Sequence, residues 1–221
     1  MKFRRKFDAV VFDCDSTLSR IEGIDELARR AGCEAEIARL TNAAMDGLIP
    51  LDQVYGKRLD AVRPDRASMA WLAERYSEDI VNGAAETIAA LKDNGTAVYV
   101  VSGGLLAGVA PFALTLGIDA AHVYAVDMTF SSNGDYVAFD ADSPLTRNDG
   151  KAVMCRVISE RHGSVAIVGD GITDLAARDA GAYVVGFGGV VRRAAVEKAA
   201  DHYITSPDLT ATLAALLTDK E

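Results

Sequence analysis

Two carboxylates stand close together at the end of a short apolar run near the start of the chain. Residues 9–12 are apolar, and Asp13, Asp15, Ser16 and Thr17 follow within the next five positions. Short β-branched runs are typical of buried strands in parallel sheets, whose ligands bind beyond the carboxyl ends of the strands. Two like charges held this close need a cation or a shared proton. On this stretch alone, a turn whose side chains cap backbone groups is an equal alternative.

Two further apolar runs, residues 96–101 and 164–168, are expected strands that also end in polar residues. Each polar group has a structural alternative, namely a turn, a solvated lysine or a helix N-cap. However, the carboxyl ends of parallel strands lie along one edge of a sheet, so the groups are expected to converge. The groups are Ser102, Gly103 and Gly104 after the first run, Asp170 and Asp174 after the second, and Lys151 in the helix before it.

These residue types together favour phosphate chemistry. Carboxylates are hard oxygen ligands, and where no Cys or His residues occur at metal-binding spacing they favour Mg²⁺ over zinc or copper. A lysine and a serine hydroxyl beside glycine N–H groups form a receptor for a phosphate. A metal, a phosphate receptor and a carboxylate nucleophile are the parts of phosphoryl transfer through an aspartyl-phosphate.

The elements that must position these groups alternate between helices and strands from residue 83 onward. This alternation predicts an α/β fold, with a Rossmann-like parallel sheet flanked by helices and linked by right-handed crossovers. The pair Asn133-Gly134 predicts a hairpin between runs 124–130 and 136–139. Residues 18–80 show only helical periodicity. We interpret them as a small helical cap of the four-helix-bundle type, inserted into a core domain of residues 1–17 and 81–221.

The composition excludes several classes of partner. The 221-residue chain carries a formal net charge of -9, which argues against nucleic acid or an anionic membrane as a partner. The three cysteines are odd in number and lack metal-binding spacing, as expected in a reducing compartment. No apolar run approaches the ~18 residues of a membrane span. We therefore expect a soluble, cytoplasmic monomer or homodimer.

Four motifs in this order resemble the haloacid dehalogenase superfamily of phosphohydrolases. They are DCDST, VVSGG, the lone lysine of RNDGK, and GDGITD. The longer stretches DCDSTLSRIEGIDELA and SPLTRNDGKA are similar to the phosphoserine phosphatases, and the resemblance runs from Asp8 to about Val191. It implies a haloacid dehalogenase-like fold and Mg²⁺-dependent hydrolysis of O-phospho-L-serine to L-serine and phosphate, the last step of serine biosynthesis.

The resemblance also implies roles for the acidic residues. Asp13 would be the nucleophile that becomes phosphorylated, and Asp15 the general acid that protonates the leaving alkoxide and then the base that activates water. The metal would be bound by the Asp13 side chain, the Asp15 main-chain carbonyl and Asp170, with Asp174 supporting the metal shell.

The remaining matched positions would bind substrate. The phosphate would lie against Ser102, Gly103, Gly104 and Lys151, with Thr173 as a polar group on the substrate side. In the cap, Glu22 would contact the substrate ammonium, Arg58 its carboxylate, and Met45 an apolar part. Leu51 departs from the pattern, because relatives often carry Phe there.

Three other functions compete with this hypothesis. A related phosphatase could act on a different small phosphomonoester, which would show no preference for phosphoserine. A receiver-type signalling module also gathers Asp, Ser or Thr, and Lys at strand ends around Mg²⁺, but it needs neither the paired acids on the first strand nor a cap. A catalytically silent binding protein is disfavoured by the intact Asp13, Asp15, Lys151 and Asp170.

Overall fold

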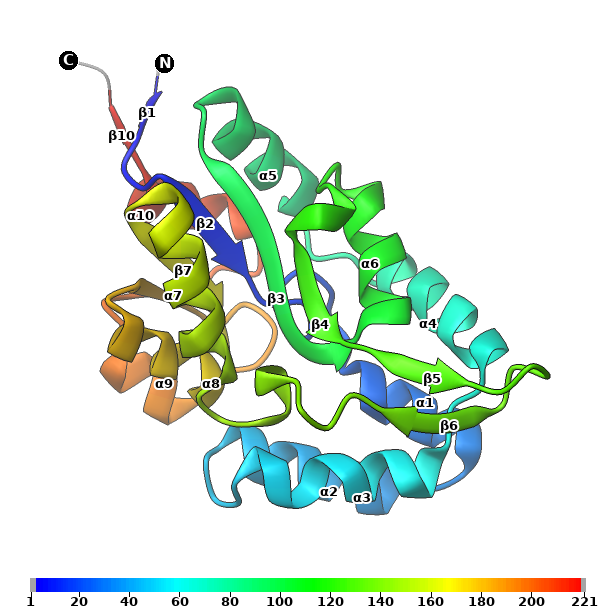
Figure 1. The fold of residues 1–221 in the computed structure, drawn as a ribbon. Helices are drawn as coiled ribbons and strands as arrows, with labels where there is room; N and C mark the ends of the chain where they lie inside the picture. The colour runs from blue at the N-terminus through cyan, green and yellow to red at the C-terminus, as the bar shows by residue number, and fades with distance from the viewer. Residues whose placement is uncertain (1–2, 220–221) are drawn as a thin grey trace.

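A six-stranded parallel sheet lies at the centre of the computed structural model, which describes residues 3–219 (Figure 1). The strand order is β4-β3-β2-β7-β8-β9. Every residue of β2 and β7 is buried, because helices cover both faces of the sheet and leave no strand face for polar residues. The predicted α/β class is confirmed. The strands are β2 (Ala9–Phe12), β3 (Ala97–Leu105), β4 (Val123–Val126), β7 (Val165–Gly169), β8 (Tyr183–Phe187) and β9 (His202–Ile204).

The strand order reverses at β2. Phe12 pairs with Val100 of β3 on one side and with Val168 of β7 on the other. The chain builds outward from β2 to β4, returns to the centre at β7, and builds outward again to β9. The carboxyl ends of β2, β3 and β7 therefore meet at a topological switch point, where α/β sheets bind their ligands.

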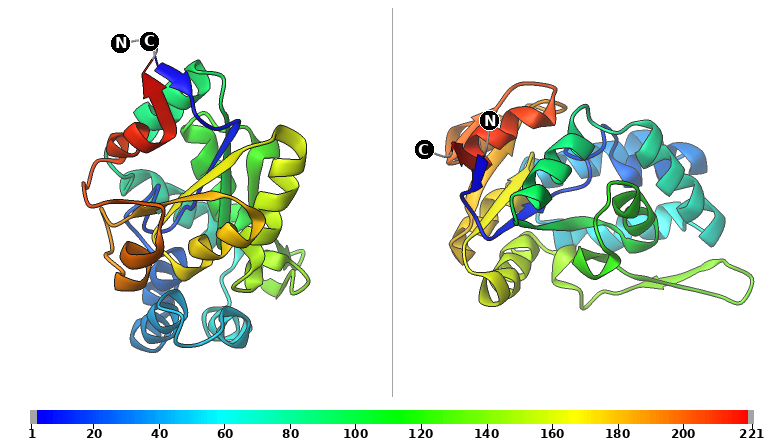
Figure 2. Two further views of the ribbon diagram at one scale, coloured as in Figure 1. Left: turned by 90° about the vertical axis from the view of Figure 1, so that its left-hand side faces the viewer. Right: turned by 90° about the horizontal axis from the view of Figure 1, so that it is seen from above.

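Helices cover both faces of the sheet, as right-handed crossovers require. Figure 2 shows α5 and α6 on one face and α7 on the other. The helices of this part are α5 (Ala84–Asp93), α6 (Leu106–Thr115), α7 (Gly150–His162), α8 (Ile172–Leu175), α9 (Ala194–Ala199) and α10 (Leu213–Leu216). Short 3-10 turns cover Ala120–His122, Pro144–Thr146, Ala176–Ala180 and Leu209–Thr212.

The segment between β2 and α5 contains four helices: α1 (Gly23–Ala31), α2 (Glu34–Met45), α3 (Leu51–Val62) and α4 (Arg66–Glu78). The helix α3 starts after Pro50, and α4 starts after its N-cap residue Asp65, whose side chain accepts a hydrogen bond from the Ser68 N–H. Within 18–80 the β-structure consists of one isolated bridge, Ser19 to Ile80, which brings the ends of the segment together.

The structure corrects the expected strand 96–101, because β3 continues to Leu105 and includes the SerGlyGly stretch. Its pairing with β4 shifts register between Val101 and Leu105. A register shift of this kind occurs where small residues let a strand bend, and it keeps the glycine backbone beside the neighbouring strand ends.

A second correction concerns the run 124–130, which divides between two sheets. Its first part is β4, and its second part is β5 (Met128–Phe130), which forms the predicted hairpin with β6 (Tyr136–Phe139). The hairpin lies against the four-helix segment, where the Arg66 N–H donates to the Gly134 carbonyl at 2.9 Å. One small sheet was not expected: β1 (Phe3–Arg5) pairs antiparallel with β10 (Leu217–Asp219).

Candidate active site

Three charged side chains meet between the ends of β2 and β7. Asp13 follows β2, and Lys151 reaches it from α7 with its Nζ 2.6 Å from the Asp13 Oδ2. The same Nζ lies 2.7 Å from the Asp174 Oδ1, and all three residues are buried. Burial lowers the pKa of the Lys151 ammonium, but the adjacent Asp13 and Asp174 carboxylates outweigh it and hold that pKa above its usual value.

Asp174 packs directly on the end of β7. A Cβ atom at Gly169 would lie 2.1 Å from the Asp174 Cγ, so only glycine admits this contact. The Asp174 Oδ2 accepts a hydrogen bond from the Gly171 N–H at 3.0 Å, while Oδ1 pairs with Lys151. Both oxygens of Asp174 are therefore engaged, and this carboxylate orients the lysine.

Carboxylate oxygens of Asp13, Asp170 and Asp174 lie within 4.8 Å of one another and are buried. Burial, followed by the Asp13 charge, raises the pKa of Asp170 from 3.8 to about 7. The Asp170 Oδ2 accepts from the Arg193 Nε at 3.0 Å, and Oδ1 has no protein donor among the interactions of residues 3–219. An oxygen-only cluster of like charges fits a hard divalent cation, which would neutralise it.

The second acid, Asp15, points to the other side of the site. Its Oδ1 accepts hydrogen bonds from the Gly23 N–H at 2.6 Å and the Tyr76 hydroxyl at 2.8 Å. Burial and the charge of Asp13 raise its pKa from 3.8 to about 6. The Asp15 side chain is thus separate from the cluster of three carboxylates, and its pKa suits a group that releases and regains a proton near neutral pH.

The SerGlyGly stretch of β3 runs beside these acids. The Ser102 hydroxyl accepts from the Gly104 N–H at 2.9 Å and lies 3.5 Å from the Asp15 Oδ2. A Cβ atom at Gly104 would lie only 3.1 Å from that same oxygen. The Gly103 carbonyl accepts from the Tyr55 hydroxyl at 2.8 Å. Glycines thus let the backbone approach the acids closely enough to bind a small anion between them.

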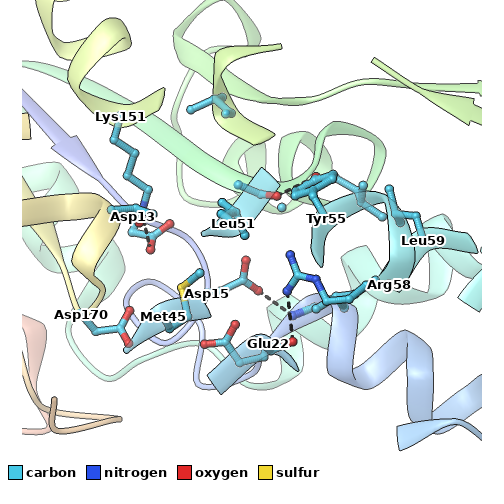
Figure 3. A pocket seen from close by; sticks show the side chains of 18 of the residues that line it. Asp13, Asp15, Glu22, Met45, Leu51, Tyr55, Arg58, Leu59, Lys151 and Asp170 are labelled. Carbon is cyan, nitrogen blue, oxygen red and sulfur yellow. Dashed lines mark hydrogen bonds and ion pairs between the residues drawn. The ribbon is translucent and has the colours of Figure 1, made fainter. Parts of the chain in front are cut away.

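The expected substrate residues of the four-helix segment line the same pocket as Asp13. Figure 3 shows Glu22, Met45 and Arg58 around the pocket, with Arg58 across from Lys151. Thr173 also lines it. The Glu22 Oε1 accepts from the Ser16 hydroxyl at 2.8 Å, and burial, followed by the Asp15 charge, raises the pKa of Glu22.

Arg58 is buried, and it forms no ion pair with a carboxylate of residues 3–219. Its Nη1 donates to the Thr41 hydroxyl at 3.1 Å, and its Nε makes no hydrogen bond within the described part of the chain. Burial lowers the pKa of this guanidinium. A buried cation that faces a pocket and lacks a protein counter-ion is a receptor for an anionic group of a ligand.

Three residues of the site were not found from the sequence. Arg193 bridges Asp170 and the α2 end, with its Nη1 2.8 Å from the Asp46 Oδ1. It follows β8, so the reasoning that was applied to the other strand ends could have found it. Tyr55 and Tyr76 lie within helices, where no local pattern separates them from ordinary core residues.

The comparisons with known proteins agree with this geometry. Residues 10–178 match the family model described as haloacid dehalogenase-like hydrolase. The chain belongs to this family. It is 35% identical over 200 residues to the phosphoserine phosphatase of Mus musculus, covering 90% of this chain and 89% of the relative.

Two solved structures share the fold closely. A phospho-aspartyl intermediate analogue of phosphoserine phosphatase has a TM-score of 0.82 and 27% identity, covering 97% of this chain and 100% of its own. A substrate-bound phosphoserine phosphatase complex has a TM-score of 0.81 and 27% identity, covering 96% and 100%. The predicted family, its fold and its hydrolase chemistry are therefore confirmed. In residues 3–219, no helix has both the length and the apolar character needed to cross a bilayer.

Proposed function

We propose that this protein is a Mg²⁺-dependent phosphatase that hydrolyses O-phospho-L-serine through an aspartyl-phosphate, the last step of serine biosynthesis. One observation carries the proposal. A single pocket is lined by Asp13 and Lys151 on one side and by Glu22 and Arg58 on the other. A ligand that fills it presents a phosphate to the first pair and further charged groups to the second.

Phosphoserine has the charges that this pocket complements. Its carboxylate matches the unpaired Arg58 guanidinium, and its ammonium matches the Glu22 carboxylate. Once the ammonium is bound, Glu22 gains a positive neighbour that offsets the repulsion from Asp15 and Asp170. A sugar phosphate would leave both residues without a charged partner at a buried site, which is costly.

The reaction follows from the two acids. In the first step, the Asp13 carboxylate attacks phosphorus, the bond to the serine oxygen breaks, and Asp15 gives its proton to that oxygen. In the second step, water attacks phosphorus, the bond to Asp13 breaks, and Asp15 takes a proton from the water. Lys151 offsets the charge of Asp13 while an anionic phosphate approaches. Bound Mg²⁺, held by Asp13, Asp170 and the Asp15 carbonyl with support from Asp174, would neutralise the phosphoryl charge.

We also propose that residues 18–80 act as a cap over a core of residues 1–17 and 81–221. The hydrogen bonds that join them near the pocket include Tyr55 to the Gly103 carbonyl and the Leu51 N–H to the Asn148 side chain at 2.8 Å. Breaking a few such contacts would open the pocket, and remaking them would exclude water from the phosphoryl transfer.

Cellular context forms a further part of the proposal. The three cysteines, Cys14, Cys33 and Cys155, are all free. Free thiols are expected in the reducing cytoplasm, and we propose that the enzyme acts there as a monomer or homodimer, without nucleic acid or membrane as a partner. Size-exclusion chromatography with light scattering measures the oligomeric state.

The test is a phosphate-release assay with and without Mg²⁺, on phosphoserine, phosphothreonine, a sugar phosphate and an aryl phosphate. We expect phosphoserine to have the highest kcat/KM and chelation to abolish turnover. Arg58→Ala should raise KM for phosphoserine by about tenfold or more, the worth of a hydrogen bond between charged groups. The exposed Arg39 of α2 offers the matched control, and Arg39→Ala should behave like wild type.

Three outcomes separate the alternatives. Unchanged phosphoserine kinetics in Arg58→Ala would reject this substrate and leave another small phosphomonoester as the target. A single equivalent of phosphate retained on the protein, without multiple turnover, would support a receiver-type module. Phosphate that is neither released nor retained would support a binding protein.

A further inference from the structure

The hydroxyl of Tyr76 holds one oxygen of Asp15 from a helix that is anchored on the core. Tyr76 lies near the end of α4 and is completely buried. Its ring stacks on Phe112 of α6, with ring centroids 5.5 Å apart and planes 22° apart. Its hydroxyl donates to the Asp15 Oδ1 at 2.8 Å. The ring contact fixes where the hydroxyl lies, so this donor is preorganised.

Gly23 provides the space for this hydroxyl. A Cβ atom at Gly23 would lie 2.0 Å from the Tyr76 Oη and 3.3 Å from the Asp15 Oδ1. The Gly23 N–H also donates to the Asp15 Oδ1, at 2.6 Å. A glycine at the start of α1 and a tyrosine at the end of α4 therefore form a pair of donors to the same carboxylate oxygen.

This pair makes the two oxygens of Asp15 unequal. Oδ1 accepts two hydrogen bonds, and a proton placed on it would oppose both donors. Oδ2 has the Ser102 hydroxyl 3.5 Å away and lies 3.1 Å from where a Cβ atom of Gly104 would be. Oδ2 therefore faces the stretch that is expected to bind the phosphate, and it is the oxygen that is free to carry a proton.

We infer that Tyr76 is a positioning residue that, with the Gly23 N–H, holds Asp15 so that Oδ2 transfers the proton in both half-reactions. The inference rests on the proposed acid and base role of Asp15. In the first half-reaction, the bond from Asp13 to phosphorus forms, the bond from phosphorus to the substrate oxygen breaks, and the Oδ2 proton moves to that oxygen. In the second, water bonds to phosphorus, the bond to Asp13 breaks, and a water proton returns to Oδ2.

The first test is Tyr76→Phe, which removes the hydroxyl and keeps the ring on Phe112. Rapid-quench kinetics with phosphoserine measure formation and breakdown of the phosphoenzyme separately. We expect both rates to fall by about tenfold, the worth of one hydrogen bond to a charged group, while KM stays within about twofold. The matched control is Tyr99→Phe, since Tyr99 is equally buried and its hydroxyl bonds His162 at 2.7 Å near the opposite end of the sheet. It should leave both rates unchanged.

The second test is a double-mutant cycle with Asp15→Asn. If Tyr76 acts through Asp15, Tyr76→Phe should cause no further loss of rate in the Asp15→Asn background. The same tenfold loss in both backgrounds would overturn the inference, because it would show that Tyr76 supports the fold alone. Wild-type rates in Tyr76→Phe beside a large loss in Asp15→Asn would overturn the inference and leave the proposed function intact. Wild-type rates in Asp15→Asn would reject the role of Asp15 itself.

Gly23→Ala provides an independent perturbation should Tyr76→Phe fold poorly, which thermal unfolding would show. The added Cβ displaces the hydroxyl while the tyrosine remains. We expect the same loss in both rates and the same dependence on Asp15. Wild-type rates in a folded Gly23→Ala protein would contradict the inference.

Discussion

Asp170→Asn is expected to stabilise the metal-free protein at neutral pH, although it removes an ion pair with Arg193. Burial and the charge of Asp13 raise the pKa of Asp170 from 3.8 to about 7. The folded protein thus holds this proton more tightly than the unfolded chain does. The stability that the proton provides is present at low pH. It is lost as the pH rises from the pKa of Asp170 in the unfolded chain through its pKa in the folded protein. Each tenfold change in proton affinity is worth about 1.4 kcal/mol. The free energy of unfolding of the wild type should therefore have fallen by roughly 4 kcal/mol by pH ~7.5.

Urea denaturation in the presence of a chelator measures this difference. Asn mimics the protonated carboxyl, so the variant and the wild type should have similar free energies of unfolding at pH ~4. At pH ~7.5 the variant should be the more stable by about 4 kcal/mol. Mg²⁺ at about a hundredfold excess over its dissociation constant should restore about 2.7 kcal/mol to the wild type. The variant has lost a ligand oxygen and should gain much less.

Asp149→Asn is the matched control, because the Asp149 side chain is 64% exposed and pairs with Arg147 at the surface. Its stability should follow the wild type at both pH values within about 1 kcal/mol. An Asp170→Asn protein that is less stable than wild type at pH ~7.5 would refute the reasoning. So would a difference between the two proteins that does not change with pH.

Three further substitutions test the site. Asp13→Asn should abolish multiple turnover and phosphoenzyme formation, because an amide does not attack phosphorus. Acid-quench labelling with radioactive substrate detects any phosphoenzyme that still forms. Glu22→Gln should raise KM for phosphoserine by about tenfold while inhibition by inorganic phosphate stays unchanged, since only the ammonium loses its partner. Gly169→Ala should lower stability by about 1–3 kcal/mol in a thermal melt, because its Cβ would lie 2.1 Å from the Asp174 Cγ.

Residues that follow a strand could be placed from the sequence, because the geometry of a parallel sheet brings successive strand ends to one edge. The apolar run before Asp13 and the run before Asp170 predict neighbouring strand ends, and β2 and β7 are paired in the structure. Arg193 lies in the connection that follows β8, so it is on the same edge of the sheet, although it was not predicted. The run 124–130 was assigned to one strand because it is mostly apolar. The presence of Asp127 within it does not by itself show that β4 ends before this residue and β5 begins after it.

Contacts between distant segments could not be predicted in this way. Tyr76 reaches Asp15 across 61 positions, and the pairing of β1 with β10 joins the two ends of the described chain. Within its helix, Tyr76 has the apolar spacing of a core residue. Which atom its hydroxyl meets depends on how α4 packs on α6, and no local pattern contains that information.

The sequence by itself determined the fold class, the family and the set of reactive side chains, because strand ends and motif spacing are local properties. Only the tertiary structure decided how those side chains differ. Asp13 pairs with Lys151, whereas Asp15, two residues later, is held by Gly23 and Tyr76. Both residues lie beyond the last residue of β2, where the alternation of a strand no longer fixes the directions of their side chains, and their partners include residues of distant helices. The physical reason is that hydrogen bonding and burial, which separate a nucleophile from a proton carrier, are set by packing.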